Sequence, residues 1–270
     1  MVKYLFFLVS VLFVINLNAQ DGNDFYSITY VNGYKLFKNW SEPRKEYVRL
    51  IVNNGNSIHQ TFNVMCMDSI KVKRKTTSSD RNKYFTFNDY TIKTKGDSIF
   101  YSEMLGGKQY EYSEMINLKW EISKDSTVQK SGYKCQFATT TYGGRSWEAW
   151  FTLDIPISLG PYKFHGLPGL IVEIQDRDRE FYYELYGIIK TGEKKLEKLF
   201  EIEESKRLAT SRNVFNKLKF KYNGLSISEK SKFRNQMTAI NIKKYDQAGE
   251  LSSFRDTSNA DNVNLLEIPN

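Results

Sequence analysis

The sequence predicts a mainly β protein, built as a curved antiparallel sheet or half-barrel with two helices towards the C-terminal end. Three observations predict this fold. Between residues 25 and 190, aromatic and β-branched residues alternate with polar ones, which is the two-residue period of a strand. Glycine-containing pairs interrupt these runs in the manner of hairpin turns. Beyond Gly192, apolar residues recur near a helical period instead.

The first twenty residues have the composition of a secretory signal peptide. Lys3 supplies a positive charge, an apolar run covers residues 4–15, and small or polar residues follow at 18–20. The run is shorter than the roughly 20 residues that a membrane-spanning helix needs. We therefore expect cleavage after Ala19 or Gln20 and a periplasmic or secreted cell-envelope protein. Residues 21–270 are expected to form a single β-rich domain without a transmembrane span.

The charge balance favours contact with anionic surfaces of the envelope. The 39 Lys and Arg residues outnumber the 31 Asp and Glu residues, for a net charge of +8. Loss of Lys3 with the signal peptide lowers this to 38 minus 31, or +7. A net positive charge attracts phosphorylated lipids. It does not predict nucleic-acid binding, because the basic residues are scattered and the dense run at 71–75 leads into a Thr/Ser-rich stretch typical of a loop.

Two cysteines, Cys66 and Cys135, are available in a chain expected to reach an oxidising compartment. A disulfide between them would close a long loop and stabilise the fold by about 4 kcal/mol in the chain-entropy model. Two separately buried thiols are the alternative, and the spacing of the residues does not decide between them.

Ten segments have the composition and alternation of strands. They are residues 25–31, 46–52, 90–94, 98–102, 109–113, 117–123, 133–142, 145–153, 170–175 and 181–189. Tight hairpin turns are predicted at Asn32-Gly33, Asn54-Gly55 and Gly143-Gly144, where positive φ values are needed.

The Gly143-Gly144 turn sets a register for the strands on either side of it. It places Phe137 opposite Trp150 and Ala138 opposite Ala149. Both faces of this pair are then apolar. The pair is expected either to be enclosed between layers or to line a ligand cavity.

Two helices are predicted after the strands, and we expect them to cover one opening or face of the sheet. The first covers residues 203–219. The second follows Ser226 and Glu229, which form a capping box ahead of Phe233, Met237 and Ile240 on one face.

No catalytic motif is found, and the sequence predicts a protein that is not an enzyme and that uses no cofactor and no metal. The two histidines, His59 and His165, lie outside any metalloprotease motif. There is no Gly-x-Ser-x-Gly elbow, no phosphate-binding Gly-Lys-Ser/Thr loop and no close cysteine pair. An unrecognised hydrolase that uses His165 with a nearby acid or thiol is kept as an alternative.

The Pro/Gly-rich segment 154–174 is the most unusual part of the chain. Residues 167–170 fit a type II turn in which Gly169 supplies the positive φ. The segment serves either as a rigid crossover or as an apolar loop presented to a ligand or partner. For the second case the candidate contacts are Trp150, Phe164, His165, Leu167 and Pro168.

A family resemblance rests on this segment. The residues Gly166, Leu167, Pro168, Gly169, Leu170 and Ile171 spell the hexapeptide of the GLPGLI family of exported bacterial proteins. Residues 132–136, 138–140, 144–145, 149–152, 155–157 and 160–164 follow the pattern of that family in the same order. The resemblance implies an envelope protein with no assigned catalytic residue. For some members it implies association with a TonB-dependent outer-membrane receptor.

The layout of a Trp-bearing strand, a Pro/Gly turn and an apolar strand also resembles the lipoprotein-carrier fold, which implies a curved sheet that holds a lipid-like ligand. The leading hypothesis is therefore a non-catalytic binding protein of the cell envelope that holds an apolar or amphipathic ligand. The second is an accessory or structural partner of an outer-membrane receptor, which requires loop 160–169 to be exposed.

Overall fold

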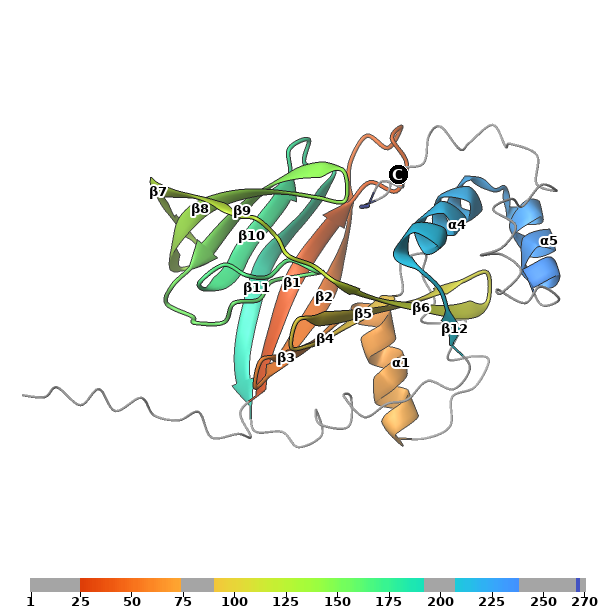
Figure 1. The fold of residues 1–270 in the computed structure, drawn as a ribbon, viewed down its shortest axis with the longest axis horizontal. Coiled ribbons are helices and arrows are strands. Elements are labelled where there is room, and N and C mark those ends of the chain that lie inside the picture. Colours follow the sequence, from red (N-terminus) through yellow and green to blue (C-terminus); the bar gives the residue numbers. More distant parts are fainter. Residues whose placement is uncertain (1–24, 74–89, 192–206, 238–265, 268–270) are drawn as a thin grey trace, which may run out of the picture.

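The computed structural model describes residues 25–73, 90–191, 207–237 and 266–267. The predicted signal peptide lies outside these residues. Twelve strands form one sheet (Figure 1) in the order β12-β6-β5-β4-β3-β2-β1-β11-β10-β9-β8-β7. The strands are β1 (Phe25–Tyr34), β2 (Arg44–Asn53), β3 (Asn56–Thr61), β4 (Tyr90–Lys95), β5 (Ser98–Leu105), β6 (Lys108–Met115), β7 (Glu121–Lys130), β8 (Tyr133–Tyr142), β9 (Arg145–Thr152), β10 (Leu170–Asp176), β11 (Phe181–Thr191) and β12 (Leu208–Ala209).

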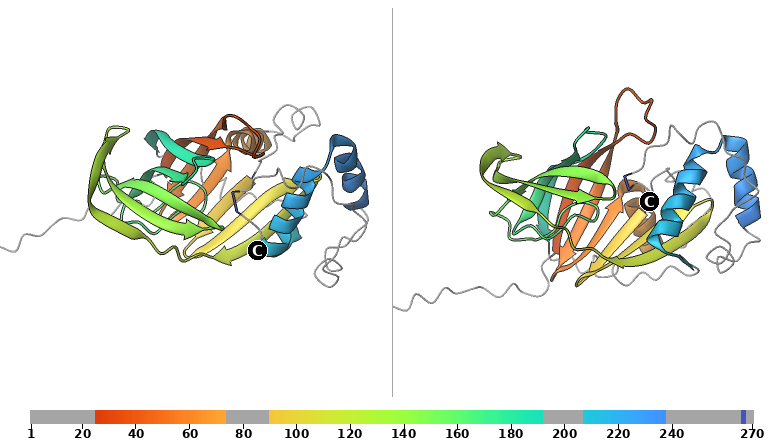
Figure 2. Two further views of the ribbon diagram at one scale, coloured as in Figure 1. Left: turned by 90° about the horizontal axis from the view of Figure 1, so that it is seen from above. Right: turned by 45° about the horizontal axis from the view of Figure 1, so that its top comes forward.

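The predicted fold class is confirmed. Neighbouring strands are antiparallel, except that the short β12 pairs parallel with β6. The sheet stays open and does not close into a barrel, because its edge strands β12 and β7 do not pair with each other. Figure 2 shows the sheet curving into an open trough, with α4 beside β5 and β6. The concave face of this trough carries the core.

The two C-terminal helices are confirmed, although the first begins later than predicted. The first, α4 (Arg212–Gly224), starts at the N-cap Ser211, because Leu208 is used in β12 instead. The second, α5 (Ile227–Met237), has the expected capping box, in which the Ser226 amide donates to the Glu229 carboxylate over 2.8 Å. The predicted extension of the second helix to Ile240 lies outside the described residues.

Strand β3 and helix α1 (Phe62–Lys73) were not predicted from the sequence. The helix has no clear apolar stripe, so its periodicity gives little signal. Residues 71–73 of the basic run end this helix rather than begin a loop. The strand predicted at 117–123 is wrong in its first half, because residues 116–120 are irregular and β7 begins at Glu121.

Two of the three predicted hairpin turns are confirmed and one is wrong. Asn54-Gly55 and Gly143-Gly144 have the positive φ values of tight turns, 47° and 77° for the first pair and 61° and 76° for the second. Gly33 instead lies inside β1, where a Cβ atom would be 2.1 Å from the ring of Tyr182. This glycine is required by a ring that packs on the strand, not by a turn.

The predicted β8–β9 register is confirmed, with Phe137 opposite Trp150 and Ala138 opposite Ala149. The two faces of the pair differ more than their composition indicates. Ala138, Ala149 and Phe151 are fully buried on one face, while Phe137 and Trp150 are only partly buried on the other. The pair is therefore not enclosed between two layers.

The structure contains no disulfide between Cys66 and Cys135. Cys66 lies in α1, which packs against β2 and β3, whereas Cys135 lies in β8. Six strand spacings separate β3 from β8 in the sheet, or about 29 Å along its surface. The structure thus corresponds to the alternative of two separate thiols. Among the described residues, no helix is both long and apolar enough to cross a bilayer.

Candidate functional site

The loop between β9 and β10 folds into the trough instead of projecting from it. Tyr162, Lys163, Phe164 and Leu167 are all buried. Backbone hydrogen bonds hold the loop, including one of 3.2 Å from the Ile171 amide to the Leu159 carbonyl. The exposed loop that docking of a receptor to residues 160–169 would require is therefore not observed.

The type II turn predicted at residues 167–170 is wrong, because Gly169 does not have a positive φ. Gly166 has one instead, at 93°. Gly169 is required for another reason: a Cβ atom at this position would lie 1.9 Å from the carbonyl oxygen of Thr152. Only glycine lets the start of β10 approach the end of β9 so closely.

The five candidate contacts predicted from the sequence do not form one surface. Phe164 and Leu167 are buried, with the Phe164 ring 4.6 Å from that of Trp147 between centroids. Pro168 is exposed. Trp150 is on the opposite face of β9 from Ala149 and packs on Phe137, at 4.9 Å between ring centroids.

The His165 ring bridges two backbone segments. Its Nδ1 lies 2.8 Å from the carbonyl oxygen of Lys163, and its Nε2 lies 3.0 Å from that of Ile116. Carbonyls only accept hydrogen bonds, so a ring N–H is the donor wherever the imidazole bonds to one of them. The observed contacts place neither a thiol nor a hydroxyl against this ring.

The other two groups considered for chemistry are buried in the core. Burial raises the pKa of the Cys135 thiol to about 11, which keeps it protonated and a poor nucleophile. Burial lowers the pKa of His59 to about 3, so that its imidazole is neutral. The His59 ring stacks on Tyr90, and neither ring nitrogen has a hydrogen-bond partner among the described residues.

The loop between β9 and β10 contributes a buried lysine, Lys163, and a cluster of polar groups surrounds it. The Lys163 side chain is fully buried, and its Nζ donates to Glu267 over 2.5 Å, to Glu114 over 2.6 Å and to the Tyr112 hydroxyl over 2.8 Å. Four aromatic rings surround the ammonium at 4.9 to 5.8 Å from their centroids. They belong to Tyr101, Tyr112, Tyr142 and Tyr162. Cation–π attraction and two carboxylates thus replace water around this charge.

The carboxylate of Glu267 is the second centre of the cluster. Oε1 accepts from Lys163, from the Tyr142 hydroxyl at 3.1 Å and from the Tyr162 hydroxyl. Oε2 accepts from Arg212 Nε at 2.6 Å and from Asn216 Nδ2 at 3.2 Å. Burial raises the pKa of this carboxyl, but the charges of Lys163 and Arg212 outweigh burial and hold the pKa well below its usual value.

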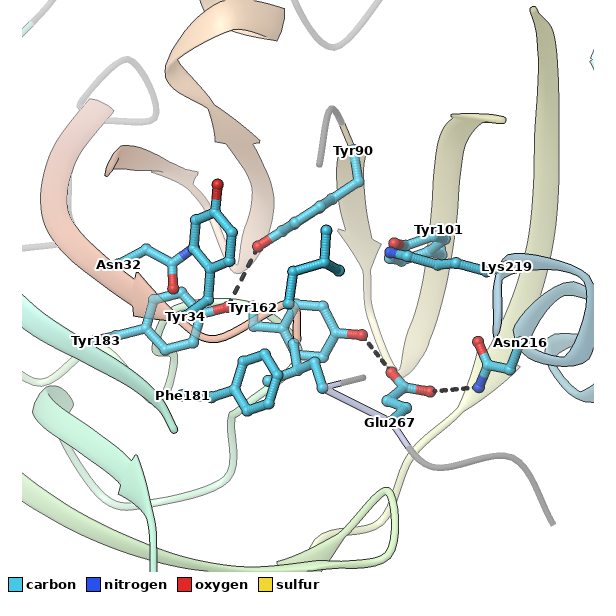
Figure 3. A pocket seen from close by; sticks show the side chains of 12 residues that line it. Asn32, Tyr34, Tyr90, Tyr101, Tyr162, Phe181, Tyr183, Asn216, Lys219 and Glu267 are labelled. Carbon is cyan, nitrogen blue, oxygen red and sulfur yellow. Dashed lines mark hydrogen bonds between the residues drawn. The ribbon is translucent and has the colours of Figure 1, made fainter. Parts of the chain in front are cut away.

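A small cavity of about 40 Å³ adjoins the cluster. Figure 3 shows tyrosine rings from several strands and the Glu267 carboxylate around it. Its tyrosines are Tyr34, Tyr90, Tyr101, Tyr162 and Tyr183, and Asn32, Asn216, Lys219 and Glu267 add polar groups. This volume is enough for a few water molecules and is far smaller than an acyl chain.

A second ion pair lies at the α4 side of the cavity. Lys219 of α4 donates to Glu103 Oε2 over 2.8 Å, and the Tyr101 hydroxyl donates to the same oxygen. The other oxygen, Glu103 Oε1, is buried without a hydrogen-bond partner among the described residues. The cavity is therefore bordered by charges on both sides.

Sequence reasoning did not single out Lys163, Glu114 or Glu267, although one signal was present. Lys163 lies between Tyr162 and Phe164 in an otherwise apolar stretch. A lysine in such surroundings is either exposed on a loop or buried with partners. Its partners lie 49 and 104 positions away, so the sequence shows no pattern that joins them.

Comparisons with known proteins identify a fold but no activity. A family model described as "Protein of unknown function (Porph_ging)" matches residues 107–173, which extend from β6 into β10 and include Lys163. No curated protein matches. These matches leave the GLPGLI resemblance as a prediction, because none names that family or excludes it.

Two solved structures of PNGF-II, one in space group P21 and one in C2, have similar folds. Both have a TM-score of 0.51, with 14% and 15% sequence identity respectively. The similarity covers 73% of this chain and 33% of the PNGF-II chain. The chain thus spans about a third of the length of PNGF-II, and at this identity the similarity shows the fold alone.

Proposed function

We propose that this chain is a non-catalytic binding protein of the cell envelope and that its ligand enters the tyrosine-lined cavity on the concave face of the sheet. The observation that supports this most is the convergence of Asn216, Lys219 and Glu267 on one cavity, with Lys163 bonded to Glu267 behind it. A cavity with a few converging polar groups is the usual form of a small-molecule site.

Energetics support a functional interpretation of these buried charges. Burying a charged pair costs several kcal/mol in desolvation, and well-packed apolar residues often stabilise a core as well or better. The neighbouring strands β8 to β10 have such an apolar interior, with Ala138, Ala149 and Phe151 fully buried. One part of the sheet is thus stabilised mainly by apolar packing, without a buried charged cluster of this kind.

The cavity favours a polar group over an acyl chain. Tyrosine hydroxyls, two amides and an ammonium border a space of only about 40 Å³. Such a lining suits a small polar ligand, or the polar head group of an amphipathic one. Export by the predicted signal peptide and a net positive charge would place this site near the anionic envelope surface.

Native mass spectrometry of the protein purified from its own host tests the proposal. We expect a bound small molecule in the wild type and its loss in Leu36→Trp, because Leu36 lines the cavity and a larger ring would fill it. The matched control is Leu153→Trp at a side chain that is 60% exposed, and this variant should keep the ligand. The comparison of the variants requires that both keep the unfolding temperature of the wild type. A wild type that is always empty would contradict the proposal.

An accessory role beside an outer-membrane receptor is a second candidate, and a different surface favours it. Tyr47 of β2 and Tyr186 of β11 are exposed and pack edge to face at 5.2 Å between centroids. Exposed aromatic pairs are frequent in protein interfaces. A photo-cross-linker at position 186 should then capture an outer-membrane protein in intact cells, whereas one at Leu153 should not. Equal yields from the two positions would remove this candidate.

A further inference from the structure

We propose that Lys163, Arg212 and Asn216 form a carboxylate-binding site, and that Glu267 occupies it as an internal stand-in for the carboxylate of a ligand. This inference rests on the proposed binding function and adds the chemical class of the ligand. It also places the carboxylate of that ligand at the side of the cavity that Asn216 and Glu267 line.

The donors are arranged around one carboxylate. Five groups from β8, from the β9–β10 loop and from α4 donate to the two oxygens of Glu267. An ionised carboxylate has about four lone-pair sites, so the group is saturated. Figure 3 shows the carboxylate of Glu267 between Tyr162 and Asn216 and bonded to both. The donor set is that of a ligand site, because each carboxylate oxygen receives one charged donor and at least one neutral donor.

The Glu267 segment is held through this side chain and through Leu266, which packs against the core. Among the described residues, no backbone hydrogen bond joins Leu266 or Glu267 to the rest of the fold. Lys163 is different, because its loop is pinned by backbone bonds such as that from the Gly166 amide to the Ser158 carbonyl, 3.1 Å. The donors therefore belong to the fixed framework, and the carboxylate is the part that can be exchanged.

The charges of the cluster select a single negative charge. Lys163 and Arg212 supply two positive charges, and Glu114 and Glu267 supply two negative ones. Removal of Glu267 leaves two positive groups and one negative group, a net charge of +1. Lys163 then keeps its 2.6 Å bond to Glu114. A carboxylate restores neutrality, whereas a phosphate dianion would overshoot it. A buried site favours the occupant that leaves no uncompensated charge.

Exchange would also make room for a larger ligand. Leu266 and Glu267 both line the cavity of about 40 Å³, so their departure enlarges that same cavity. The newly opened space continues into the part lined by Tyr34, Tyr90 and Tyr183. A carboxylate attached to a polar or aromatic body therefore fits the site better than a free small anion.

Binding of propionate, which reproduces the side chain of glutamate, tests the exchange directly. We expect Glu267→Ala to bind propionate at least about 10-fold more tightly than the wild type. The reason is that a site which is open only 1–10% of the time has its apparent affinity lowered about 10- to 100-fold. Wild-type binding should be weak but saturable. Propionamide, the neutral isostere, should bind Glu267→Ala at least about 10-fold more weakly than propionate, as seen by ligand-observed NMR.

The matched control is Glu173→Ala, which also removes a carboxylate paired with a lysine, here Lys130 at 2.7 Å. This variant should bind propionate as the wild type does. If Glu267→Ala fails to fold, Glu267→Gln serves instead, because it keeps the shape of the side chain and removes its charge. The same gain in propionate affinity is expected from it.

Three outcomes would overturn the inference: no propionate binding by a folded Glu267 variant, no binding by the wild type, or equal affinity for propionate and propionamide. None of them removes the proposed function, which fails only if the purified protein is always empty. An acetylated Gly-Gly-Ala peptide with a free C-terminus distinguishes the sources of the carboxylate. Tighter binding than propionate supports a peptide ligand, and weaker binding supports a small organic acid.

Discussion

The two arms of the sheet have inner faces of opposite character. The arm formed by β8, β9 and β10 is mainly apolar inside, with Ala138, Trp147, Ala149, Phe151 and Ile174 at 1% exposure or less. The arm from β3 to β6 instead carries a row of rings stacked across four strands. They are His59, Tyr90, Tyr101 and Tyr112, with interplanar angles of 16° to 19° between successive rings.

The two arms have different roles: one packs as a core, and the other borders the candidate binding site. The apolar arm needs few hydrogen bonds inside, such as that from Trp147 Nε1 to the Tyr142 carbonyl at 3.0 Å, and its side chains interdigitate as in any core. The aromatic arm buries hydroxyls and charges, and such groups are stable in a core mainly when they are hydrogen-bonded. The β9–β10 loop carries Lys163 from the first arm to the carboxylates beside the second. One fold thus combines a stable half with a half in which a ligand can replace an internal partner.

Among the substitutions that test this comparison, Lys163→Met is expected to change the free energy of unfolding most. Removing the ammonium leaves the Glu114 and Glu267 carboxylates without their common partner in a buried site. Breaking a buried ion pair from one side usually costs about 3–5 kcal/mol. Urea unfolding should show this loss. A loss below about 1 kcal/mol would mean that the cluster contributes no more than a surface pair.

Gly169→Ala tests the junction between the apolar arm and the loop. The added methyl group would meet the Thr152 carbonyl oxygen at 1.9 Å, and backbone cannot move aside as a side chain can. We expect a loss of about 3 kcal/mol in the free energy of unfolding, the upper part of the range for overpacking.

The control for this substitution is Gly55→Ala, which has a φ of 77° and open space around its Cβ position. It should cost only about 1 kcal/mol, through backbone strain alone. Equal costs for the two variants would show that the close approach of β9 and β10 is not what requires glycine.

His59→Phe tests the aromatic arm through pH. The pKa of His59 is lowered from 6.5 to about 3, so the folded state binds a proton less readily than the unfolded state. The contribution of this residue is therefore complete above pH 6.5 and falls by about 1.4 kcal/mol per pH unit below it. Between pH 6.5 and pH 5 the wild type should lose about 2 kcal/mol from this source.

In the phenylalanine variant this part of the pH dependence should disappear, because the ring keeps its stacking on Tyr90 and has no proton to bind. Thermal unfolding measured at pH 5, 6 and 7 distinguishes the two. An unchanged slope would place His59 in water rather than in the stack.

The smallest effect is expected from Lys130→Met at the end of the edge strand β7, beside the apolar arm. Lys130 pairs with Glu173 at 2.7 Å, but their side chains are 26% and 18% exposed. Partly hydrated pairs contribute about 1 kcal/mol or less, and salt weakens them. We expect a loss within that limit that shrinks further in 1 M NaCl. A loss as large as that of Lys163→Met would remove the contrast between the two arms.

Local features of the fold could be predicted because their causes lie within a few residues. The Gly143-Gly144 turn determines which residues of β8 and β9 face each other, and the observed register follows it. The Ser226 and Glu229 capping box likewise marks the start of α5. The turn at Gly169 was predicted wrongly, because glycine can serve either a positive φ or a close approach and the sequence pattern is the same for both.

The sequence by itself determined that this chain forms strands in a curved sheet with helices after them, since alternation, turn pairs and caps act over short distances. Only the tertiary structure decided that Lys163 lies inside, because its burial depends on Glu114 and Glu267, far away along the chain. A charge can leave water only where other charges are already in place. That condition is a property of the assembled fold and not of any segment.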